Sequence, residues 1–235
     1  MPQVPRRARI RHAGIALHVI QRGNNHSACF YATDDYRTYL DWLRELAERT
    51  DCAIHAYCLM TNHVHLLLTL GQDDSASMLM KYLGQRYVQY VNRTYKRTGT
   101  LWEGRFRSSL VQGDYHVLAC YRYIESNPVR AAMVATALEY PWSSYRFNCG
   151  IESSDWRLFH PAYLELGESV QARYAAYREL FDSGLDLDMI EKISKHTNGG
   201  FALGDERFLV ETEAMLKRRV SPGKAGRPKK SAKIR

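Results

Sequence analysis

The feature that most constrains this chain is a pair of apolar segments joined by a short link. Residues 53–59 (AIHAYCL) and 63–68 (HVHLLL) contain no Gly or Pro and have the composition of buried strands. Thr61 and Asn62 lie between them and suit a tight turn. We therefore expect the two segments to pair as an antiparallel hairpin.

Other predicted elements place this hairpin in a mixed fold. Strands are expected at residues 15–21 and 108–111, and helices at residues 33–49, 75–95 and 115–126. The resulting order is strand, helix, two strands, helix, strand, helix. This order predicts an α+β fold in which helices pack on the faces of a mostly antiparallel sheet.

Composition divides the chain into four predicted parts. We expect a basic arm at residues 1–12, the main domain at 13–150, a helical extension at 151–216 and a basic tail at 217–235. Within the extension, residues 171–181 and 206–218 are the better helix candidates.

The excess positive charge lies in the tail. The chain carries 33 Lys and Arg against 25 Asp and Glu, for a net charge of +8. Nine of the basic residues and no acidic residue fall within residues 217–235, so the rest of the chain is close to neutral. A flexible polycation attracts polyanions with a strong salt dependence, which predicts contact with nucleic acid.

The cysteines and the apolar pattern indicate a cytoplasmic protein. There are five cysteines, an odd number, and no two are closely spaced, which argues against a disulfide framework. No apolar run approaches the length of a membrane span, so we expect no membrane contact. The basic N-terminus lacks the apolar core of a secretory signal.

Two histidines in the second hairpin segment form a candidate metal site. Side chains alternate along a strand, so His63 and His65 are expected to point to the same face. Neutral imidazole is a common metal ligand, and two on one face make half of a site. A His-x-His pair in a strand is also often two buried, hydrogen-bonded histidines, and the pattern alone leaves both interpretations open. A zinc site that adds Cys52 or Cys58 matches no structural zinc spacing.

A second stretch supplies a third ligand and a nucleophile. Tyr123 and Asn127 are four residues apart and would lie on one helix face. The Asn side-chain carbonyl suits Mg²⁺ or Mn²⁺, and such a metal can polarise a phosphodiester for attack by a phenol. The chain contains 16 tyrosines, and spacing alone does not distinguish Tyr123 from Tyr121 or Tyr115.

These stretches, taken in order, resemble one family. The matching motifs are HV at 18–19, RGNN at 22–25, HVH at 63–65, WEGRF at 102–106, RYIESNPVRA at 122–131 and PWSSY at 141–145. Together they resemble the REP-associated tyrosine transposases, which are in the single-tyrosine branch of the His-hydrophobic-His (HUH) endonucleases. The resemblance covers roughly residues 10–170. It implies a ferredoxin-like, RRM-like HUH fold.

The resemblance also implies an activity and the roles of four residues. Members of the family cut single-stranded DNA beside repetitive palindromic hairpins, forming a 5′-phosphotyrosine and freeing a 3′-OH. By motif, Tyr123 would be the nucleophile, and His63, His65 and Asn127 would hold a divalent metal, Mg²⁺ or Mn²⁺. The wider transposase group often has Gln at the position of Asn127, and Asn resembles the REP-associated subgroup.

DNA contacts are expected from loops and from the tail. Arg22, Asn24, Arg105 and Arg107 lie on loops that would flank the site. The tail residues Arg227, Lys229 and Lys230 lie in GRPKK, which resembles an AT-hook core for the minor groove. A generic basic tail is an equal alternative.

One further expectation and two alternatives complete the hypothesis. We expect a nucleoid-associated monomer, in which Tyr123 acts in its own site, rather than a dimer with swapped helices. A first alternative is a catalytically silent nucleic-acid-binding protein that retains the fold. A second is a metallohydrolase that uses His63 and His65 with a water nucleophile and forms no protein–DNA adduct.

Overall fold

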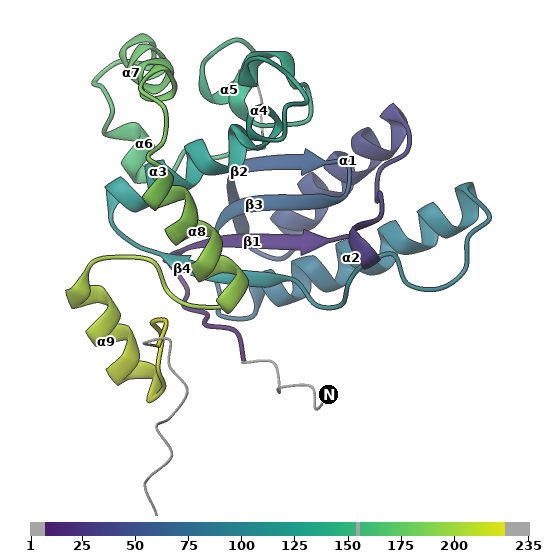
Figure 1. Ribbon diagram of the computed structural model, residues 1–235, viewed down its shortest axis with the longest axis horizontal. Coiled ribbons are helices and arrows are strands. Elements are labelled where there is room, and N and C mark those ends of the chain that lie inside the picture. Colours follow the sequence, from purple (N-terminus) through teal and green to yellow (C-terminus); the bar gives the residue numbers. More distant parts are fainter. Residues whose placement is uncertain (1–7, 154–155, 224–235) are drawn as a thin grey trace, which may run out of the picture.

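The computed structural model describes residues 8–153 and 156–223. Its centre is a four-stranded sheet with neighbouring strands antiparallel, in the order β2-β3-β1-β4 (Figure 1). The strands are β1 (Ala16–Arg22), β2 (Cys52–Met60), β3 (His63–Leu70) and β4 (Arg107–Val111). The predicted α+β fold is confirmed, and β2 and β3 form the expected hairpin across Thr61 and Asn62.

Helices cover both faces of this sheet. The longer ones are α1 (Thr33–Arg49), α2 (Ser75–Thr94), α3 (Asp114–Glu125), α7 (Val170–Asp182), α8 (Leu187–Gly199) and α9 (Glu206–Leu216). The short ones are η1 (Asn24–His26), α4 (Asn127–Arg130), η2 (Ala137–Glu139), α5 (Tyr145–Asn148) and α6 (Pro161–Leu164). Figure 1 shows α1 and α2 behind the sheet and α3 and α8 in front of it. No helix in the described ranges is long and apolar enough to span a membrane.

Strand alternation produces two separate cores. Leu17 and Val19 of β1 point toward α1 and α2, where they are fully buried. Leu67 of β3 lies on the other face, with Ile124 of α3 and Ile193 of α8. Burial of each such side chain contributes about 2 kcal/mol. Because β1 and β3 are buried on both faces, any polar residue on them is held by a rigid support.

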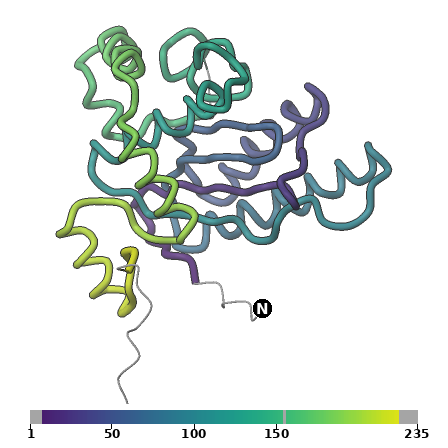
Figure 2. The backbone as a smooth tube through the Cα atoms, viewed as in Figure 1, coloured from purple at the N-terminus to yellow at the C-terminus, as the bar shows by residue number. Residues whose placement is uncertain are grey.

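The C-terminal part of the chain packs against strands β1 and β4. Figure 2 shows the chain of α8 returning in front of β1, although about 170 residues separate them. After α8, Leu203 N donates to Leu110 O at 2.7 Å, and Gln112 N donates to Leu203 O at 2.9 Å. These bonds cover part of the exposed edge of β4.

Some of the predicted parts lie outside the described residues. They include most of the predicted N-terminal arm and the tail residues Arg227, Lys229 and Lys230. The start of the predicted tail does lie within the structure, where Val220 is fully buried and its carbonyl accepts from Ala202 N at 2.8 Å. The division between a main domain and an extension at residue 150 stays a prediction.

Candidate active site

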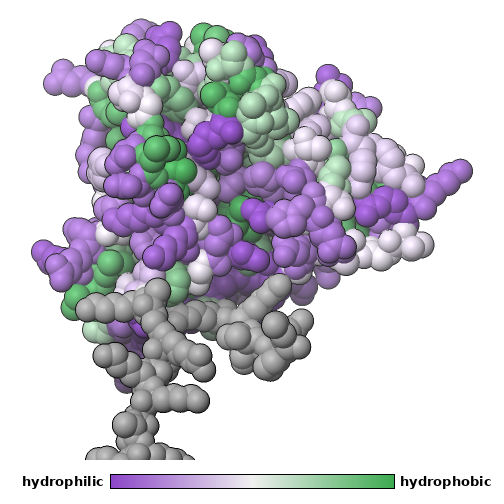
Figure 3. Space-filling view, viewed as in Figure 1, coloured by the Kyte–Doolittle hydropathy of each residue, from purple (hydrophilic) through white to green (hydrophobic). Residues whose placement is uncertain are grey.

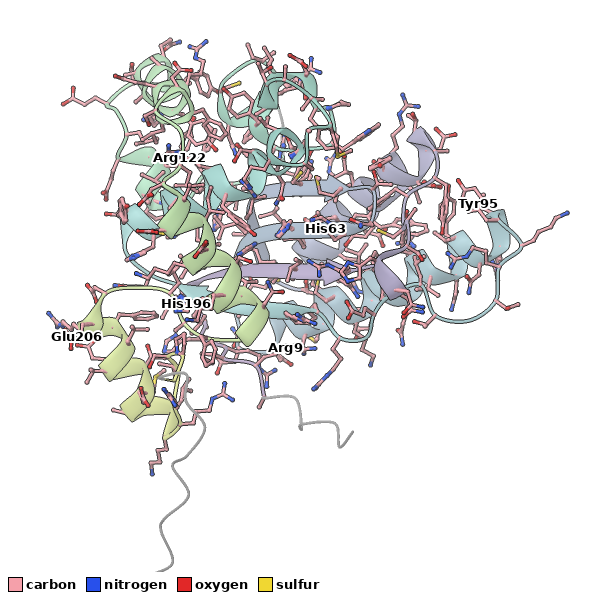
Figure 4. All side chains as sticks on the ribbon, viewed as in Figure 1. Arg9, His63, Tyr95, Arg122, His196 and Glu206 are labelled. Carbon is pink, nitrogen blue, oxygen red and sulfur yellow. The ribbon has the colours of Figure 1, made fainter. Side chains whose placement is uncertain are left out.

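His63 and His65 lie on the same face of β3, toward α3. Their ring centroids are 5.0 Å apart, and His65 is almost fully buried while His63 is partly exposed. Figure 4 labels His63 on the face seen in Figure 1, and Figure 3 shows mostly hydrophilic residues in the middle of this face, beside α8. The site is therefore built on the central part of the sheet and opens at a polar surface.

Burial keeps both imidazoles neutral. It lowers the pKa of His63 to about 4, with Arg22 adding to the effect. It lowers the pKa of His65 well below the ordinary histidine value, and the neighbouring His18 contributes. A neutral imidazole keeps one nitrogen lone pair, which is the form that binds a metal ion.

A third histidine, His18 of β1, contacts His65. His18 Nε2 lies 2.9 Å from His65 Nδ1, and His18 Nδ1 lies 2.8 Å from the hydroxyl oxygen of Thr197 on α8. The strand register places His18 opposite Leu67, so His18 and His65 are diagonal neighbours on one face. Burial lowers the pKa of His18 to about 3. The result is a continuous polar chain from α8 to β3.

Tyr123 of α3 lies against these two histidines. Its ring centroid is 5.7 Å from that of His65 and 5.7 Å from that of His18, with both pairs edge-on. The Arg130 guanidinium lies 4.3 Å from the centre of the Tyr123 ring and donates to the Tyr123 carbonyl at 2.8 Å. This contact places a positive charge beside the Tyr123 ring.

The other two candidate tyrosines lie elsewhere. Tyr121 is fully buried, and its hydroxyl oxygen accepts from His160 N at 3.1 Å. Tyr115 is 66% exposed, and its ring contacts that of His116. Of the three, the structure brings only Tyr123 to the histidine pair.

Asn127 begins α4, one turn after Tyr123. The predicted helix over residues 115–126 ends at Glu125, and Pro128 in the first turn of α4 starts a new helix. The Asn127 amide nitrogen is buried, and it has no hydrogen-bond partner among the described residues. Among the described residues, the side-chain hydrogen bonds of His63 and His65 go to Asn62 and His18, and none joins either histidine to Asn127.

These residues fit a divalent metal. In the described ranges, no three His, Cys, Asp or Glu side chains form a metal-binding group, so the candidate set is His63, His65 and the Asn127 amide. Both histidines make their side-chain hydrogen bonds through Nδ1, His63 with Asn62 Oδ1 and His65 with His18 Nε2, so Nε2 is the nitrogen that would bind a metal. A flipped Asn127 amide would present its oxygen where the unpaired nitrogen lies. Nitrogen and neutral oxygen donors suit several divalent ions, and such a set leaves coordination positions for a phosphate.

Three of the four residues predicted on loops lie together at the end of β1. The loop assignment is wrong for two of them, since Arg22 is the last residue of β1 and Arg107 is the first residue of β4. Arg22, Arg105 and Arg107 line one small recess, together with Asn198 of α8. The loop that carries Arg105 is held in place because Glu103 N donates to Arg22 O at 2.9 Å. Asn24 lies in η1, and its backbone N donates to Leu101 O at 2.8 Å.

Sequence reasoning assigned no role to His18, Thr197 or Arg130. Alternation along β1 could have placed His18 on the face of Arg22, but the register against β3 was needed to bring it to His65. Thr197 lies 179 residues from His18, and no local pattern marks it. Arg130 belongs to the motif at residues 122–131, although its contact with Tyr123 crosses the break between two helices.

Comparisons with known proteins agree with the resemblance predicted from the motifs. Residues 12–127 match the model of a family described as IS200-like transposases. A putative REP-associated tyrosine transposase from Haemophilus influenzae is 25% identical over 138 residues, which cover 54% of this chain and 78% of the relative. The solved structure of a REP-associated tyrosine transposase bound to a REP hairpin has the same fold. Its TM-score is 0.53 at 18% identity, over 67% of this chain and 95% of that chain.

Proposed function

We propose that this protein, whose residues 12–127 match the model of the IS200-like transposases, cuts and transfers single-stranded DNA beside REP-type palindromic hairpins. It does so as a metal-dependent endonuclease and strand transferase through a 5′-phosphotyrosine. The observation that carries the proposal is the contact of the Tyr123 ring with His65 and His18.

Each part of this site has a task in the reaction. The Tyr123 oxygen attacks phosphorus, a P–O bond to tyrosine forms, and the bond to the 3′ oxygen breaks to give a free 3′-OH. The reverse attack by a 3′-OH transfers the strand. A bound Mg²⁺ or Mn²⁺ would polarise the phosphate, and His63, His65 and Asn127 would hold it. Arg130 contacts the Tyr123 ring and donates to the Tyr123 carbonyl, which positions the tyrosine.

The DNA contacts follow from charge and from the neighbouring structure. Arg22, Arg105 and Arg107 line the recess at the end of β1, where they would bind phosphates beside the cut, with Asn24 next to them. The solved neighbour carries a REP hairpin, and we assign the same kind of partner to this chain. The basic tail with Arg227, Lys229 and Lys230 would add affinity for DNA.

Two further proposals concern the setting of the reaction. Tyr123 and His65 of one chain already lie together, which supports a monomer whose tyrosine acts in its own site. The five buried free cysteines and the basic tail support a cytoplasmic, nucleoid-associated protein.

The experiment is an incubation with a labelled hairpin that carries single-stranded flanks, in Mg²⁺, followed by a denaturing protein gel. Wild type should give a covalent protein–DNA band, and Tyr123→Phe should give none, because it lacks the attacking oxygen. Tyr115→Phe is the matched control, since Tyr115 is exposed away from the site, and it should retain the band.

Other outcomes favour the alternatives. Binding without any adduct or cleavage would identify a silent DNA-binding protein. Cleavage without an adduct would identify a metallohydrolase with a water nucleophile.

A further inference from the structure

A groove of about 640 Å³ lies on the face of the sheet opposite to the histidines. Helix α2 forms one wall, and the segment from Thr100 to Phe106 forms the other. Two rows of α2 residues line it at helical spacing. One row is polar, with Ser77, Lys81, Gln85 and Gln89, and the other consists of Met80, Gly84 and Val88.

Gly84 makes a notch in the second row. It lies in the interior of the 20-residue helix α2, where Gly is less favourable than Ala. A Cβ atom at Gly84 would meet nothing closer than Trp102 Nε1 at 3.8 Å and Gln21 Nε2 at 3.9 Å, which are ordinary contacts. An Ala would therefore fit, and the missing side chain leaves a recess backed by Trp102 and Gln21.

The back of this recess carries two unpaired polar atoms. Trp102 is 6% exposed and Gln21 is 7% exposed, yet Trp102 Nε1 and Gln21 Oε1 have no hydrogen-bond partner among the described residues. Buried groups of this kind are nearly always paired. The N–H of Trp102 donates only and the Gln21 oxygen accepts only, so together they match a flat group that presents an acceptor beside a donor.

The rim of the groove is positively charged. It carries Arg9, Lys81 and Arg105, and no Asp or Glu is among the described residues that line it. The Arg9 guanidinium lies 3.6 Å from the centre of the Phe106 ring. Burial, with Arg105 and Arg11 close by, lowers the pKa of Arg9 to about 10. These crowded cations favour an anionic ligand such as phosphate.

The groove shares lining residues with the recess beside Arg22. Arg105 lines both this groove and the recess beside Arg22. A third hollow, along Phe106, Arg107 and Ser108, connects the two around the edge of β4. Figure 4 labels Arg9 below β4, near this edge. A single strand bound in the recess beside Arg22 therefore has a basic path to the notch.

We infer that the notch at Gly84 binds one unpaired nucleobase of the single strand that passes from the active site around the edge of β4. Trp102 and Gln21 contact the polar edge of the base, and Arg9 and Arg105 contact the adjoining phosphates. The inference rests on the proposed function, because it requires single-stranded DNA as the ligand. Each of the four bases offers a donor beside an acceptor on its pairing edge, and the two protein atoms suit that common feature.

The test is a scan of the single-stranded flanks of a labelled hairpin oligonucleotide. One base at a time is replaced by an abasic residue, and affinity is measured by fluorescence anisotropy at constant salt. For wild type we expect one flank position at which the abasic change weakens binding about tenfold. Trp102→Phe and Gly84→Leu should weaken binding of the intact oligonucleotide by a similar factor. In these variants the abasic change should cause no further loss of affinity.

Controls separate this effect from misfolding. Trp42→Phe alters a partly buried Trp on α1, outside the groove, and should keep the wild-type scan. Gln21→Leu replaces an amide whose oxygen is unpaired by an apolar group of similar size, so the variant should fold as wild type does. Its affinity should no longer depend on whether the base at the sensitive flank position is present.

Two results distinguish failure of the inference from failure of the proposed function. If the variants bind the intact oligonucleotide as wild type does, with an unchanged abasic scan and normal adduct formation, the notch takes no base. If wild type neither binds the hairpin nor forms an adduct, the proposed function is wrong, and the inference is wrong with it.

Discussion

His18 Nε2 lies 2.9 Å from His65 Nδ1, and this contact decides which nitrogen of His65 would have a free lone pair for the proposed metal. Both rings are neutral, so one of them donates to the other. His65 Nε2 is free to ligate only when Nδ1 carries the proton and donates it to His18. The single N–H proton of neutral His18 then lies on Nδ1, and the Thr197 hydroxyl must accept that hydrogen bond.

Replacing Thr197 by Val tests this relay. Val keeps nearly the same size but cannot accept the hydrogen bond, so the metal-binding tautomer of His65 is less favoured. We expect Mn²⁺ affinity to fall by about tenfold, as for other groups that orient metal ligands. Isothermal titration calorimetry measures it. Thr212→Val, at another buried Thr on α9, is the control and should bind Mn²⁺ as wild type does. Equal affinities in both variants would refute the relay.

The three proposed metal ligands should differ in their importance. His63→Ala and His65→Ala each remove one of two imidazoles and should abolish cleavage while leaving hairpin binding largely intact. Asn127→Ala should reduce cleavage less, because water can replace one neutral oxygen ligand. Gel assays of cleavage and anisotropy of binding measure both effects. Cleavage by wild type that persists in EDTA would show that the metal site is wrong.

Glu125 should make stability fall as the pH rises. This carboxyl is fully buried, and it accepts from Asn148 Nδ2 and from the Tyr177 hydroxyl, each at 2.6 Å, and from Ser144. Burial raises its pKa from 4.5 to about 7. The folded state therefore holds the proton more tightly than the unfolded state. The resulting stability is fully present below pH 4.5 and is lost as the pH rises through about 7.

Buried histidines also make stability depend on pH. The effect of Glu125 is therefore the difference in the free energy of unfolding between wild type and Glu125→Gln. Over that interval wild type should lose about 3 kcal/mol relative to the variant. Urea unfolding at a series of pH values measures the free energy of unfolding. Glu179→Gln, at an exposed position of α7, should follow the wild-type profile. Parallel profiles for wild type and Glu125→Gln would mean that the carboxyl does not titrate in this range.

Removing the tail should weaken DNA binding. Because Val220 is packed in the core, the truncation belongs after Gly223. The removed residues, 224–235, contain six Lys and Arg and no acidic residue. Affinity for the hairpin should fall and its salt dependence should flatten, since fewer counterions are released. Anisotropy titrations at several salt concentrations measure both. An unchanged affinity and salt slope would show that the tail does not bind DNA.

The local parts of the site could be predicted from the sequence. His63 and His65 share a face because side chains alternate along a strand, and two residues of helix rotate Tyr121 away from Tyr123. The hairpin across Thr61 and Asn62 could be predicted from the two adjoining segments alone. Each of these relationships spans few residues and follows from backbone geometry alone.

The contacts between distant segments could not be predicted in this way. The His18–His65 pair depends on the register of β1 against β3, which the packing of two cores sets together. The Gly84 notch depends on how the loop with Trp102 folds back over α2. The break after Glu125 shows a further limit, since Pro128 allowed a second helix to start where the sequence analysis expected the first to end.

The hydrogen bond between Thr197 and His18 has a consequence during synthesis of the protein. A ribosome that has released β1, β3 and α3 has produced His18, His65 and Tyr123, yet Thr197 is still to be made. During that interval the partial chain has its tyrosine and its histidines, but it lacks the Thr197 hydroxyl that contacts His18 Nδ1. Translation of α8 therefore completes this hydrogen-bonded group, and a product that ends before α8 would carry the residues of the candidate site without the contact between Thr197 and His18.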